Sequence, residues 1–406
     1  MMKILYKTLK VFLAITLLFI YGCSEDTTPS LVDLPSEELP TPVLTSIDPP
    51  GFGLAGVTVV TITGSNFSTS TFGNLVFFNG ISATVLSATS TQIKVIAPNL
   101  VADTVIVKMA GYKSENFSNS LNYKLEPAVS EYYVFNRDIP ERPYGICTDH
   151  QDNVYVSVSN ITLGLGIKKI MPGVVPYIDF APKGGETFFK GLAITPDNTI
   201  YGARGLRGIF KIVENTAPAA FVSSSNGIAD NVTDVDYDAT RNVLWGGGTT
   251  GILYKIGLDK NVKKFNINGI VSALRVAGND LFVATRTDNE EIVWRVPIVN
   301  ADSLGTAEQY FNFSTSINIA LKIADIVLSE DGDLYIGTDA TSDPIYVVHL
   351  DKSFEVFYPG LIDSKVYSFS WGYGNILYMT NIDLNSDNNY VNTTLLKIDM
   401  QKSGAH

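Results

Sequence analysis

The sequence predicts an all-β protein in which a small sandwich is followed by a six-bladed β-propeller. Apolar and polar residues alternate in short runs through residues 43–125, as they do in half-buried strands. Beyond residue 130, a strand–turn–strand pattern centred on an aromatic residue recurs six times. The composition agrees, because 20 Tyr and 21 Phe favour pleated sheets and 33 Gly supply turns between strands.

Residues 1–22 have the organisation of a secretory signal peptide. Three lysines precede the apolar run of residues 11–20, which is too short to span a bilayer of about 30 Å. The run ends in Ile20-Tyr21-Gly22-Cys23, which resembles the lipobox of bacterial lipoproteins. The resemblance implies cleavage before Cys23, lipidation of Cys23 and attachment to the membrane through this anchor only. The alternative is an ordinary signal peptide in which Cys23 occurs by chance.

Residues 23–42 predict a solvated tether. This segment is acidic, rich in proline and poor in aromatic residues. Its Ser24-Glu25-Asp26 resembles the acidic export signal of surface lipoproteins in Bacteroidetes. That resemblance implies an outer-membrane protein whose folded body faces the cell exterior. A lipoprotein that faces the periplasm, with an acidic linker by chance, is the alternative.

The charge balance disfavours nucleic acid as a partner. The formal charge is −12, whereas binding to a phosphate backbone depends on Lys and Arg. The chain has two cysteines, and lipidation of Cys23 would leave Cys147 without a partner, so no disulfide is expected. Cys147 lies in an apolar run and is expected to pack as a small buried residue. A catalytic pair with His150 is the less favoured alternative, because no third residue is evident to orient it.

Residues 43–125 predict about seven short strands, with Asn79-Gly80 as a strong hairpin signal. The segment Val60-Thr61-Ile62-Thr63-Gly64-Ser65-Asn66-Phe67 resembles a strand and turn of the IPT/TIG domain. Further pieces of that family's pattern are Ile47-Asp48-Pro49, Val76-Phe77-Phe78-Asn79-Gly80 and Ile93-Lys94-Val95-Ile96-Ala97-Pro98. The resemblance implies an immunoglobulin-like sandwich that serves mainly as a spacer and carries no catalytic residue.

Residues 130–401 predict the propeller. The aromatic residues that centre its repeats lie 37 to 53 residues apart, close to the spacing of propeller blades. They are Tyr155, Tyr201, Trp245, Phe282, Tyr335 and Tyr378. The sixth repeat lacks a fourth strand. Residues 131–136 have the character of one and are expected to pair with residues 395–399, which would close the ring and remove its exposed edges.

Two of the repeats resemble a known family. Arg142-Pro143-Tyr144-Gly145-Ile146-Cys147-Thr148-Asp149, with residues 152–156 after it, is close to the NHL repeat. Residues 191–197 are close to the same sequence pattern, and the blades are also similar to gluconolactonase-like propellers. The other four repeats keep the order and spacing of strands and turns but not the residue identities, so the subfamily of the propeller stays open.

Ligand-binding residues are expected where the loops of the propeller surround its central channel. The loops that enter the inner strands and the loops that follow the aromatic strands should project from one face. Sugars stack their apolar faces on aromatic rings, and their hydroxyls pair with charged side chains. Trp371 is the strongest aromatic candidate, although packing between blades is the alternative for each aromatic residue. The candidates are Arg142, Tyr144, Lys190, Arg204, Arg207, Asp234, Arg286, Asp325, Tyr367 and Trp371.

The similarity to gluconolactonase-like propellers would imply a central metal held by Glu, Asn and Asp. At the matching positions only Asp234 and Asp325 are carboxylates, whereas Ca²⁺ takes six or more oxygen ligands. Capping of a turn is the ordinary role for both aspartates. The sequence therefore predicts no catalytic residue, no bound metal and no cofactor. A metal-dependent lactonase or lyase is kept as the alternative.

One loop near the end of the chain has part of a calcium-binding pattern. Asp383, Asn385 and Asp387 have the 1-3-5 spacing of a calcium loop, but Asn388 stands in place of Gly and Thr394 in place of Glu. We therefore expect a surface loop rich in Asn and Asp at this place.

Together these features predict a cell-surface lipoprotein that binds a ligand without catalysis, with the sandwich as spacer and the propeller as head. This build is similar to glycan-binding lipoproteins that accompany outer-membrane uptake systems in Bacteroidetes. The similarity implies a polysaccharide or oligosaccharide, or an outer-membrane transporter protein, as the partner. A scaffold for protein–protein interaction or adhesion is a further alternative.

Overall fold

The computed structural model describes residues 39–136, 138–160, 162–300, 302–384 and 390–405. The predicted signal peptide, Cys23 and most of the tether lie outside these residues, as do Asn385, Asp387 and Asn388. The described chain is almost entirely β-strand, which confirms the all-β prediction. Its described residues divide into two compact units, one with 39–51, 59–98 and 104–124, and the other with 52–58, 99–103 and those from 125 to 405. No helix among the described residues is long and apolar enough to cross a membrane.

The predicted sandwich is formed by two antiparallel sheets. One has the strand order β1 (Val43–Asp48), β3 (Val59–Ser65), β7 (Gln92–Ile96), β6 (Thr84–Ala88). The other has the order β2 (Phe52–Ala55), β9 (Leu121–Pro127), β8 (Ala102–Gly111), β4 (Asn74–Phe78), β5 (Ile81–Ser82). Alternate residues of these strands are buried, for example Val60 and Ile62 of β3. The period-2 pattern in the sequence therefore marks the inner faces of the two sheets.

The hairpin between β4 and β5 shows why its turn could be predicted. Asn79 and Gly80 both have a positive φ, 48° and 85°. A two-residue turn of this kind matches the twist of the flanking strands, and Asn-Gly adopts it at low cost. The turn fixes the register in which Phe77 pairs with Ser82 and Phe78 with Ile81.

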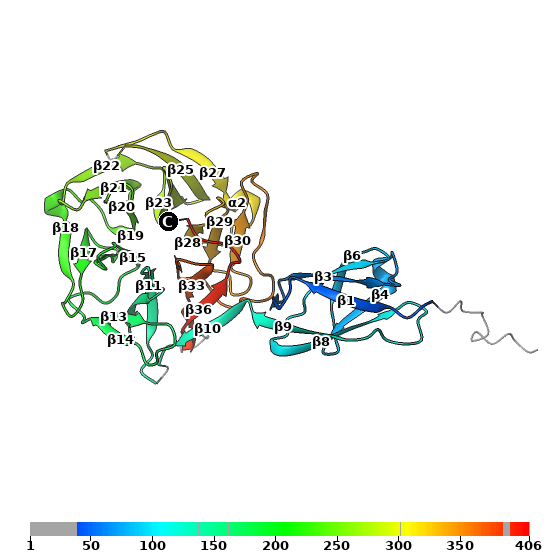
Figure 1. The fold of residues 1–406 in the computed structure, drawn as a ribbon. Helices are drawn as coiled ribbons and strands as arrows, with labels where there is room; N and C mark the ends of the chain where they lie inside the picture. Colours follow the sequence, from blue (N-terminus) through cyan, green and yellow to red (C-terminus); the bar gives the residue numbers. More distant parts are fainter. Residues whose placement is uncertain (1–38, 137, 161, 301, 385–389, 406) are drawn as a thin grey trace, which may run out of the picture. The chain divides into compact units, whose positions relative to one another are not determined.

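The propeller consists of six antiparallel sheets around a central channel (Figure 1). The inner strands are β11 (Arg142–Thr148), β15 (Gly191–Ile194), β19 (Val232–Asp238), β23 (Ile270–Ala277), β28 (Ile323–Leu328) and β32 (Ser368–Trp371). The second strands are β12 (Val154–Ser159), β16 (Ile200–Ala203), β20 (Val243–Gly248), β24 (Asp280–Arg286), β29 (Leu334–Thr338) and β33 (Ile376–Thr380). The six-bladed prediction is confirmed.

The outer half of each blade has the predicted pair of strands. The third strands are β13 (Gly164–Ile170), β17 (Gly208–Ile212), β21 (Ile252–Gly257), β25 (Glu291–Asn300), β30 (Ile345–Val348) and β36 (Thr394–Asp399). The fourth strands are β14 (Ile178–Ala181), β18 (Ala219–Ser223), β22 (Val262–Asn266), β27 (Glu308–Asn312), β31 (Phe354–Val356) and β10 (Val129–Val134). Blade four also carries β26 (Ser303–Leu304), and β34 (Asp383–Leu384) pairs with β35 (Tyr390–Asn392) between β33 and β36.

The repeated aromatic residues lie in the second strand of each blade and are buried. Trp245 and Tyr155 are among the largest fully buried side chains of the described chain. In blades one to five, the turns that precede these strands contain a residue in the left-handed region, such as Asp152 and Asn198, with φ of 57° and 61°. Asn, Asp and Gly tolerate this conformation best, which explains the Asx/Gly turn of these repeats.

The ring is closed by the strand from the front of the propeller, as predicted. Strand β10 pairs with β36, from Val129 opposite Ile398 to Val134 opposite Thr394. The strand thus spans 129–134, and not 131–136. It ends early because the next residues form a turn, in which the backbone N–H of Asn136 donates to the Glu141 carboxylate at 2.9 Å. The first and last segments of the propeller therefore share one sheet, and no blade is left with an open edge at the joint.

We expect Phe135→Ala to destabilise the propeller by about 3–5 kcal/mol, because it empties a buried site beside this joint. Phe135 is 1% exposed, and its N–H donates to the carbonyl oxygen of Thr393. Val134→Ala is the matched control, since Val134 is 46% exposed. Denaturant unfolding of both variants measures the difference. Equal stabilities for the two variants would show that the joint does not hold the ring together.

Candidate functional site

The six inner strands line the central channel and run in the same direction along it. The two ends of the channel can therefore be told apart by where these strands begin and finish. We call the end where the inner strands begin the upstream face and the end where they finish the downstream face. The ring of residues predicted from the loops belongs to the upstream face. The two hollows in the channel lie at these two ends and differ in size.

The upstream face is nearly closed. Its hollow has a volume of about 10 Å³, which is roughly the room that one water molecule needs. The hollow is lined by Lys190, Thr233, Asp234, Ser272, Ala324, Asp325 and Tyr367. Tyr144 adds to the closure, because its ring stacks on Phe188 at 3.8 Å and meets Tyr367 edge-on at 5.1 Å. The structure thus brings Tyr144, Lys190, Asp234, Asp325 and Tyr367 together, but leaves little room for a ligand among them.

The other basic residues predicted for this face have separate surroundings. Arg142 begins β11 and is half-buried, and Arg207 is exposed in the loop after β16. The guanidinium of Arg204 lies over the Phe210 ring, 4.5 Å from its centre. Arg286 pairs with the buried Glu291 and donates to the carbonyl oxygen of Ile323 at 3.3 Å. A role of these residues in ligand binding stays a prediction.

An ion network crosses the channel between the two faces. Arg275 of β23 donates through Nη1 to Asp234 of β19 at 2.8 Å, and through Nη2 to both carboxylate oxygens of Asp325 of β28 at 2.7 and 2.9 Å. Asp325 also accepts from the backbone N–H of Phe369 in β32 at 2.8 Å. Asp234 also accepts from the N–H of Leu274 at 2.9 Å. The network therefore ties the inner strands of blades three to six to one another.

The network is largely removed from water, and its pKa values reflect this. The side chain of Arg275 is 16% exposed, and those of Asp234 and Asp325 are 8% and 6% exposed. Burial raises the pKa of Asp325 to about 6, against the opposing effect of Arg275. Burial also raises the pKa of Asp236, and it lowers the pKa of Lys190. A buried carboxylate is costly unless it is paired, so Arg275 is needed to keep these aspartates ionised.

The same network bears on the metal that the gluconolactonase resemblance implies. Asp234 and Asp325 hold the guanidinium of Arg275 between them, with bidentate contact at Asp325. A metal ion bound by both carboxylates would have to displace that guanidinium. Within the described part of the chain, no three His, Cys, Asp or Glu side chains lie where they could hold a metal ion. The residues present therefore do not fit a central metal at these two aspartates.

The downstream face contains a cavity of about 220 Å³. Drug-sized ligands occupy pockets of about 300–1,000 Å³, so this cavity suits one small ring or the end of a longer chain. Its polar residues are Thr148, Asp149, His150, Thr195, Asn198, Asp236, Tyr237, Arg275, Ser370 and Tyr373. Apolar walls are formed mainly by Ile146, Cys147, Leu192, Ile194, Pro196, Val276, Val327, Leu328, Phe369 and Trp371.

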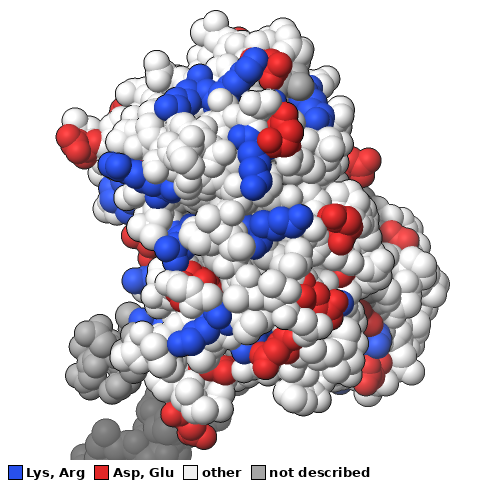
Figure 2. All heavy atoms as spheres, turned by 90° about the vertical axis from the view of Figure 1, so that its left-hand side faces the viewer, with Lys and Arg blue, Asp and Glu red and all other residues white. Residues whose placement is uncertain are grey.

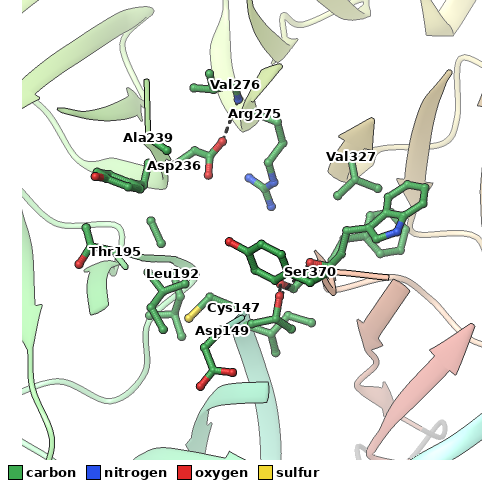
Figure 3. Close-up of a pocket in the computed structure, with 18 of the residues that line it drawn as sticks. Cys147, Asp149, Leu192, Thr195, Asp236, Ala239, Arg275, Val276, Val327 and Ser370 are labelled. Atoms are coloured by element: carbon green, nitrogen blue, oxygen red, sulfur yellow. Dashed lines mark hydrogen bonds between the residues drawn. The ribbon is translucent and has the colours of Figure 1, made fainter. Parts of the chain in front are cut away.

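Figure 3 shows how the labelled residues surround this cavity. Asp236 and Arg275 come from the neighbouring inner strands β19 and β23 and extend toward the middle from the same side. Cys147 and Leu192 lie on the opposite side, and the carboxylate of Asp149 points away from the middle. Asp236 and Arg275 thus bring charge to one side of a lining in which neutral polar and apolar side chains are mixed, an arrangement that can orient a small ligand.

Several polar residues of the cavity are held by the turns of their own blades. Asp149 accepts from the side chain of Asn153 at 2.8 and 3.1 Å and from Tyr155 Oη at 2.9 Å. Thr148 Oγ1 donates to the carbonyl oxygen of Trp371 at 2.8 Å and lies 3.0 Å from Ser370 Oγ. Asp149 therefore stabilises a turn, and the Thr148–Ser370 contact joins blades one and six.

Trp371 lies in the wall of this downstream cavity, apart from the other predicted residues. It is 6% exposed, and its ring meets Tyr335 edge-on at 5.5 Å. Its Nε1 donates to the carbonyl oxygen of Gly374 at 3.2 Å, and Gly404 lies so close to the ring that a Cβ there would clash. Trp371 therefore packs mainly between blades, which was the alternative considered for it.

Tyr373 and His150, by contrast, lie at the exposed edge of the cavity. Tyr373 is 42% exposed, and its ring centre lies 3.9 Å from that of His150. Tyr373 Oη and His150 Nε2 are 3.0 Å apart. His150 is thus engaged with Tyr373, while burial raises the pKa of the Cys147 thiol well above its usual value. Cys147 therefore stays a thiol and lines the cavity on the same side as Leu192.

The end of the described chain forms part of the cavity wall. After β36 the chain crosses to blade five, where Glu330 N–H donates to Ser403 O and Ala405 N–H donates to Leu328 O, both at 2.9 Å. Lys402 forms ion pairs with Asp331 and Asp333 at 2.8 Å each. Ala405 lines the cavity. This segment restricts the cavity on the side of blade five.

The outer surface of the molecule carries charges of both signs. On the side shown in Figure 2, basic and acidic side chains are interspersed, without a continuous stripe of one sign. Ion pairs on the outer strands contribute to this mixture, such as Lys263 with Asp302 at 3.2 Å.

The comparisons with known proteins agree with the fold. The sequence pattern of the IPT/TIG domain family matches residues 42–126. This confirms the IPT/TIG prediction for the sandwich. No curated protein matches the chain.

Solved structures that are similar to the chain carry different names. A protein from Bacteroides thetaiotaomicron VPI-5482, provisionally named a phosphatase, is 11% identical with a TM-score of 0.54, over 90% of this chain and 98% of that one. A protein provisionally named a gluconolactonase is 12% identical with a TM-score of 0.50, over 68% and 93%. An auxiliary nutrient binding protein from Bacteroides ovatus ATCC 8483 is 11% identical with a TM-score of 0.48, over 88% and 98%. These likenesses concern the fold alone, since one fold hosts many functions.

Arg275→Met should destabilise the propeller by about 3–5 kcal/mol, because it leaves two buried carboxylates without their cation. Arg207→Met is the control, and we expect it to change stability by less than about 0.5 kcal/mol because Arg207 is exposed. Urea unfolding at neutral pH measures both variants. A wild-type stability for Arg275→Met would contradict a structural role of the network.

The raised pKa of Asp325 predicts a specific pH dependence. Its pKa rises from 3.8 to about 6 on folding, so between about pH 4 and pH 6 the folded chain binds more protons than the unfolded chain. The contribution of Asp325 to stability is therefore present below pH 4 and is lost as the pH rises through 6. Asp325→Asn should flatten this part of the stability profile, measured by unfolding at a series of pH values. If the pH profile of Asp325→Asn equals that of wild type, another group causes any loss of stability between pH 4 and pH 6.

Proposed function

We propose that this chain is a binding protein whose propeller holds a saccharide ring in the downstream cavity. The observation that carries the proposal is the cavity itself, whose lining places hydrogen-bonding side chains such as Asp236 and Ser370 among apolar ones such as Leu192. Sugars present both kinds of surface in one small ring. A volume of about 220 Å³ suits one ring, so the ligand would be a monosaccharide or the terminal unit of a longer glycan.

The polar side chains could provide the hydrogen bonds that a sugar ring needs. Asp236 can accept a hydrogen bond, and the hydroxyl oxygens of Thr148, Thr195 and Ser370 offer further polar contacts. Tyr373 at the exposed edge offers an aromatic face with a polar tip, which is the usual composition of a surface that binds a partly wet ligand. Its position supports Tyr373, and not Trp371, as the aromatic residue for stacking.

The proposed setting of this binding head follows from the sequence. A signal that ends at Cys23 would anchor the chain by lipid to the outer membrane, and the acidic segment after it would place the folded body outside the cell. The IPT/TIG domain would then act as a spacer between the anchor and the propeller. A head that holds a glycan in this position would serve an uptake system in the same membrane, through its transporter protein.

Tyr373→Ala should weaken saccharide binding by about 0.5–1.5 kcal/mol, the usual value of an aromatic contact. The experiment is a thermal-shift screen against a panel of oligosaccharides, followed by calorimetric titration with the best ligand. Tyr112→Ala is the matched control, because Tyr112 is 65% exposed and lies in the sandwich. The absence of any saccharide that stabilises the protein would overturn the proposal, as would equal binding by Tyr373→Ala and wild type.

A further inference from the structure

Among the described residues, neither acidic residue of the cavity, Asp149 or Asp236, forms an ion pair. Asp149 is held by Asn153 and Tyr155 and points away from the middle, so Asp236 is the carboxylate that a ligand could reach. One of its oxygens, Oδ2, accepts from the backbone N–H of Val276 at 2.8 Å. Within the described part of the chain, no Lys, Arg or His nitrogen forms an ion pair with it, although it lines the cavity. Figure 3 shows its carboxylate extending toward the middle of the cavity. Asp236 is therefore placed to meet a ligand.

The nearest cation is already committed elsewhere. Arg275 lies beside Asp236, but its guanidinium donates to Asp234, to Asp325 and to the carbonyl oxygen of Leu274. This leaves Asp236 with a nearby positive charge but without direct contact to it. A second cation at Asp236 would therefore complete the pairing inside the channel without displacing Arg275.

The charges around the channel are unbalanced. The groups that act on Asp236 are Arg275 and Asp234, and Lys190 lies near Asp234 and Asp325 on the upstream side. Two cations thus face three carboxylates, and Asp149 adds another at the edge of the cavity. Arg286 also acts on Lys190, but its charge is paired with that of Glu291. Tyr237, Tyr373 and His150 complete the titratable residues of the lining. A negative ligand would increase this imbalance, whereas a positive ligand would reduce it.

The aromatic residues of the lining also favour a positively charged ligand. Tyr237 follows Asp236 in the chain, and Tyr373 and Trp371 lie on the side of blade six. Aromatic faces attract cations, most strongly where water is excluded. With Phe369, the lining has four such rings, so the cavity combines a carboxylate without an ion pair, a surplus of negative charge and aromatic residues.

We infer that the ligand carries a primary ammonium group that binds at Asp236, so the saccharide is an amino sugar with a free amine. This inference rests on the proposed function and narrows it. The ammonium would donate a charge-assisted hydrogen bond to Asp236, while the ring hydroxyls contact the remaining polar side chains. An N-acetylated sugar has lost this charge, and a uronic acid carries the opposite one. Both should bind less well than the free amine.

The raised pKa of Asp236 is consistent with this arrangement. Burial raises it, which means that the ionised carboxylate is disfavoured when nothing pairs with it. A bound ammonium would favour the ionised form, so binding should release a proton from Asp236 at pH values near its raised pKa.

The test compares sugars that differ only in the charged group. Wild-type protein is titrated calorimetrically with glucosamine and glucose, with galactosamine and galactose, and with N-acetylglucosamine and glucuronate. We expect at least one amine to bind about tenfold more tightly than its parent sugar, which corresponds to one charge-assisted hydrogen bond of about 1.4 kcal/mol. Glucuronate should bind most weakly of the set. Equal affinities of the amines and their parent sugars would overturn the inference.

Asp236→Asn is the decisive variant, because an Asn can still accept from Val276 but carries no charge. We expect it to lower the preference for the amine, which is the ratio of the two affinities, to about one, even if the affinity for both sugars falls. Asp288→Asn, an exposed change in the loop between β24 and β25, is the matched control and should keep the preference. Retention of the full preference in Asp236→Asn would also overturn the assignment of the amine to this residue.

Two further outcomes separate the inference from the proposed function. If parent sugars bind and amines do not bind better, the proposed function stands and the inference fails. If no sugar binds, the proposed function fails and the inference fails with it. Methylammonium is included as an amine without a sugar ring, and binding as tight as that of the amino sugars would contradict a saccharide ligand.

Discussion

The propeller depends on how its inner strands are held around the channel, and the ion network of Arg275 joins those of blades three to six. One guanidinium contacts carboxylates from the strands on either side, and one of those carboxylates reaches the backbone of a further blade. A propeller packed only by apolar residues could tolerate small rotations of its blades. Directional bonds to three neighbouring strands restrict such rotations, because they lose strength when their geometry changes.

The network also decides what the two ends of the channel can do. On the upstream side, Asp234 and Asp325 form ion pairs with Arg275. The rings of Tyr144 and Tyr367 fill much of the remaining space. On the downstream side, the inner strands end in smaller residues such as Thr148, Thr195 and Ser370, and a cavity remains. The same cation that closes one end thus leaves Asp236 at the other end without a direct partner. A structural constraint and a candidate binding site are therefore linked through a single arginine.

Much of the fold could be predicted because its signals are local. The Asn79-Gly80 turn, the alternation in β3 and the buried aromatic residues of the repeats each depend on residues close in sequence. The closing strand could be predicted from the missing strand of the last repeat. Its bounds differed by two residues, because a contact from the backbone N–H of Asn136 to the side chain of Glu141 follows the strand, and such contacts have no strong sequence signal.

The candidate site was harder to predict for a physical reason. The positions of the loops in the sequence identify residues that surround the channel at one end. Whether that end is open depends on side chains from six segments that are distant in sequence. Stacking of Tyr144 on Phe188 is one such contact. A signal for the network was present, since Arg275 interrupts an apolar strand and Asp234 and Asp325 occupy inner strands on either side. A lone charge in a buried strand usually has a partner, and this reasoning could have paired these three residues.

The most direct test of the account is a crystal structure of the protein with a bound oligosaccharide. The account predicts electron density for one sugar ring in the downstream cavity, in contact with Asp236 and beside Tyr373, while Arg275 keeps its contacts to Asp234 and Asp325. A sugar bound at the upstream face, among Lys190, Tyr144 and Tyr367, would contradict it.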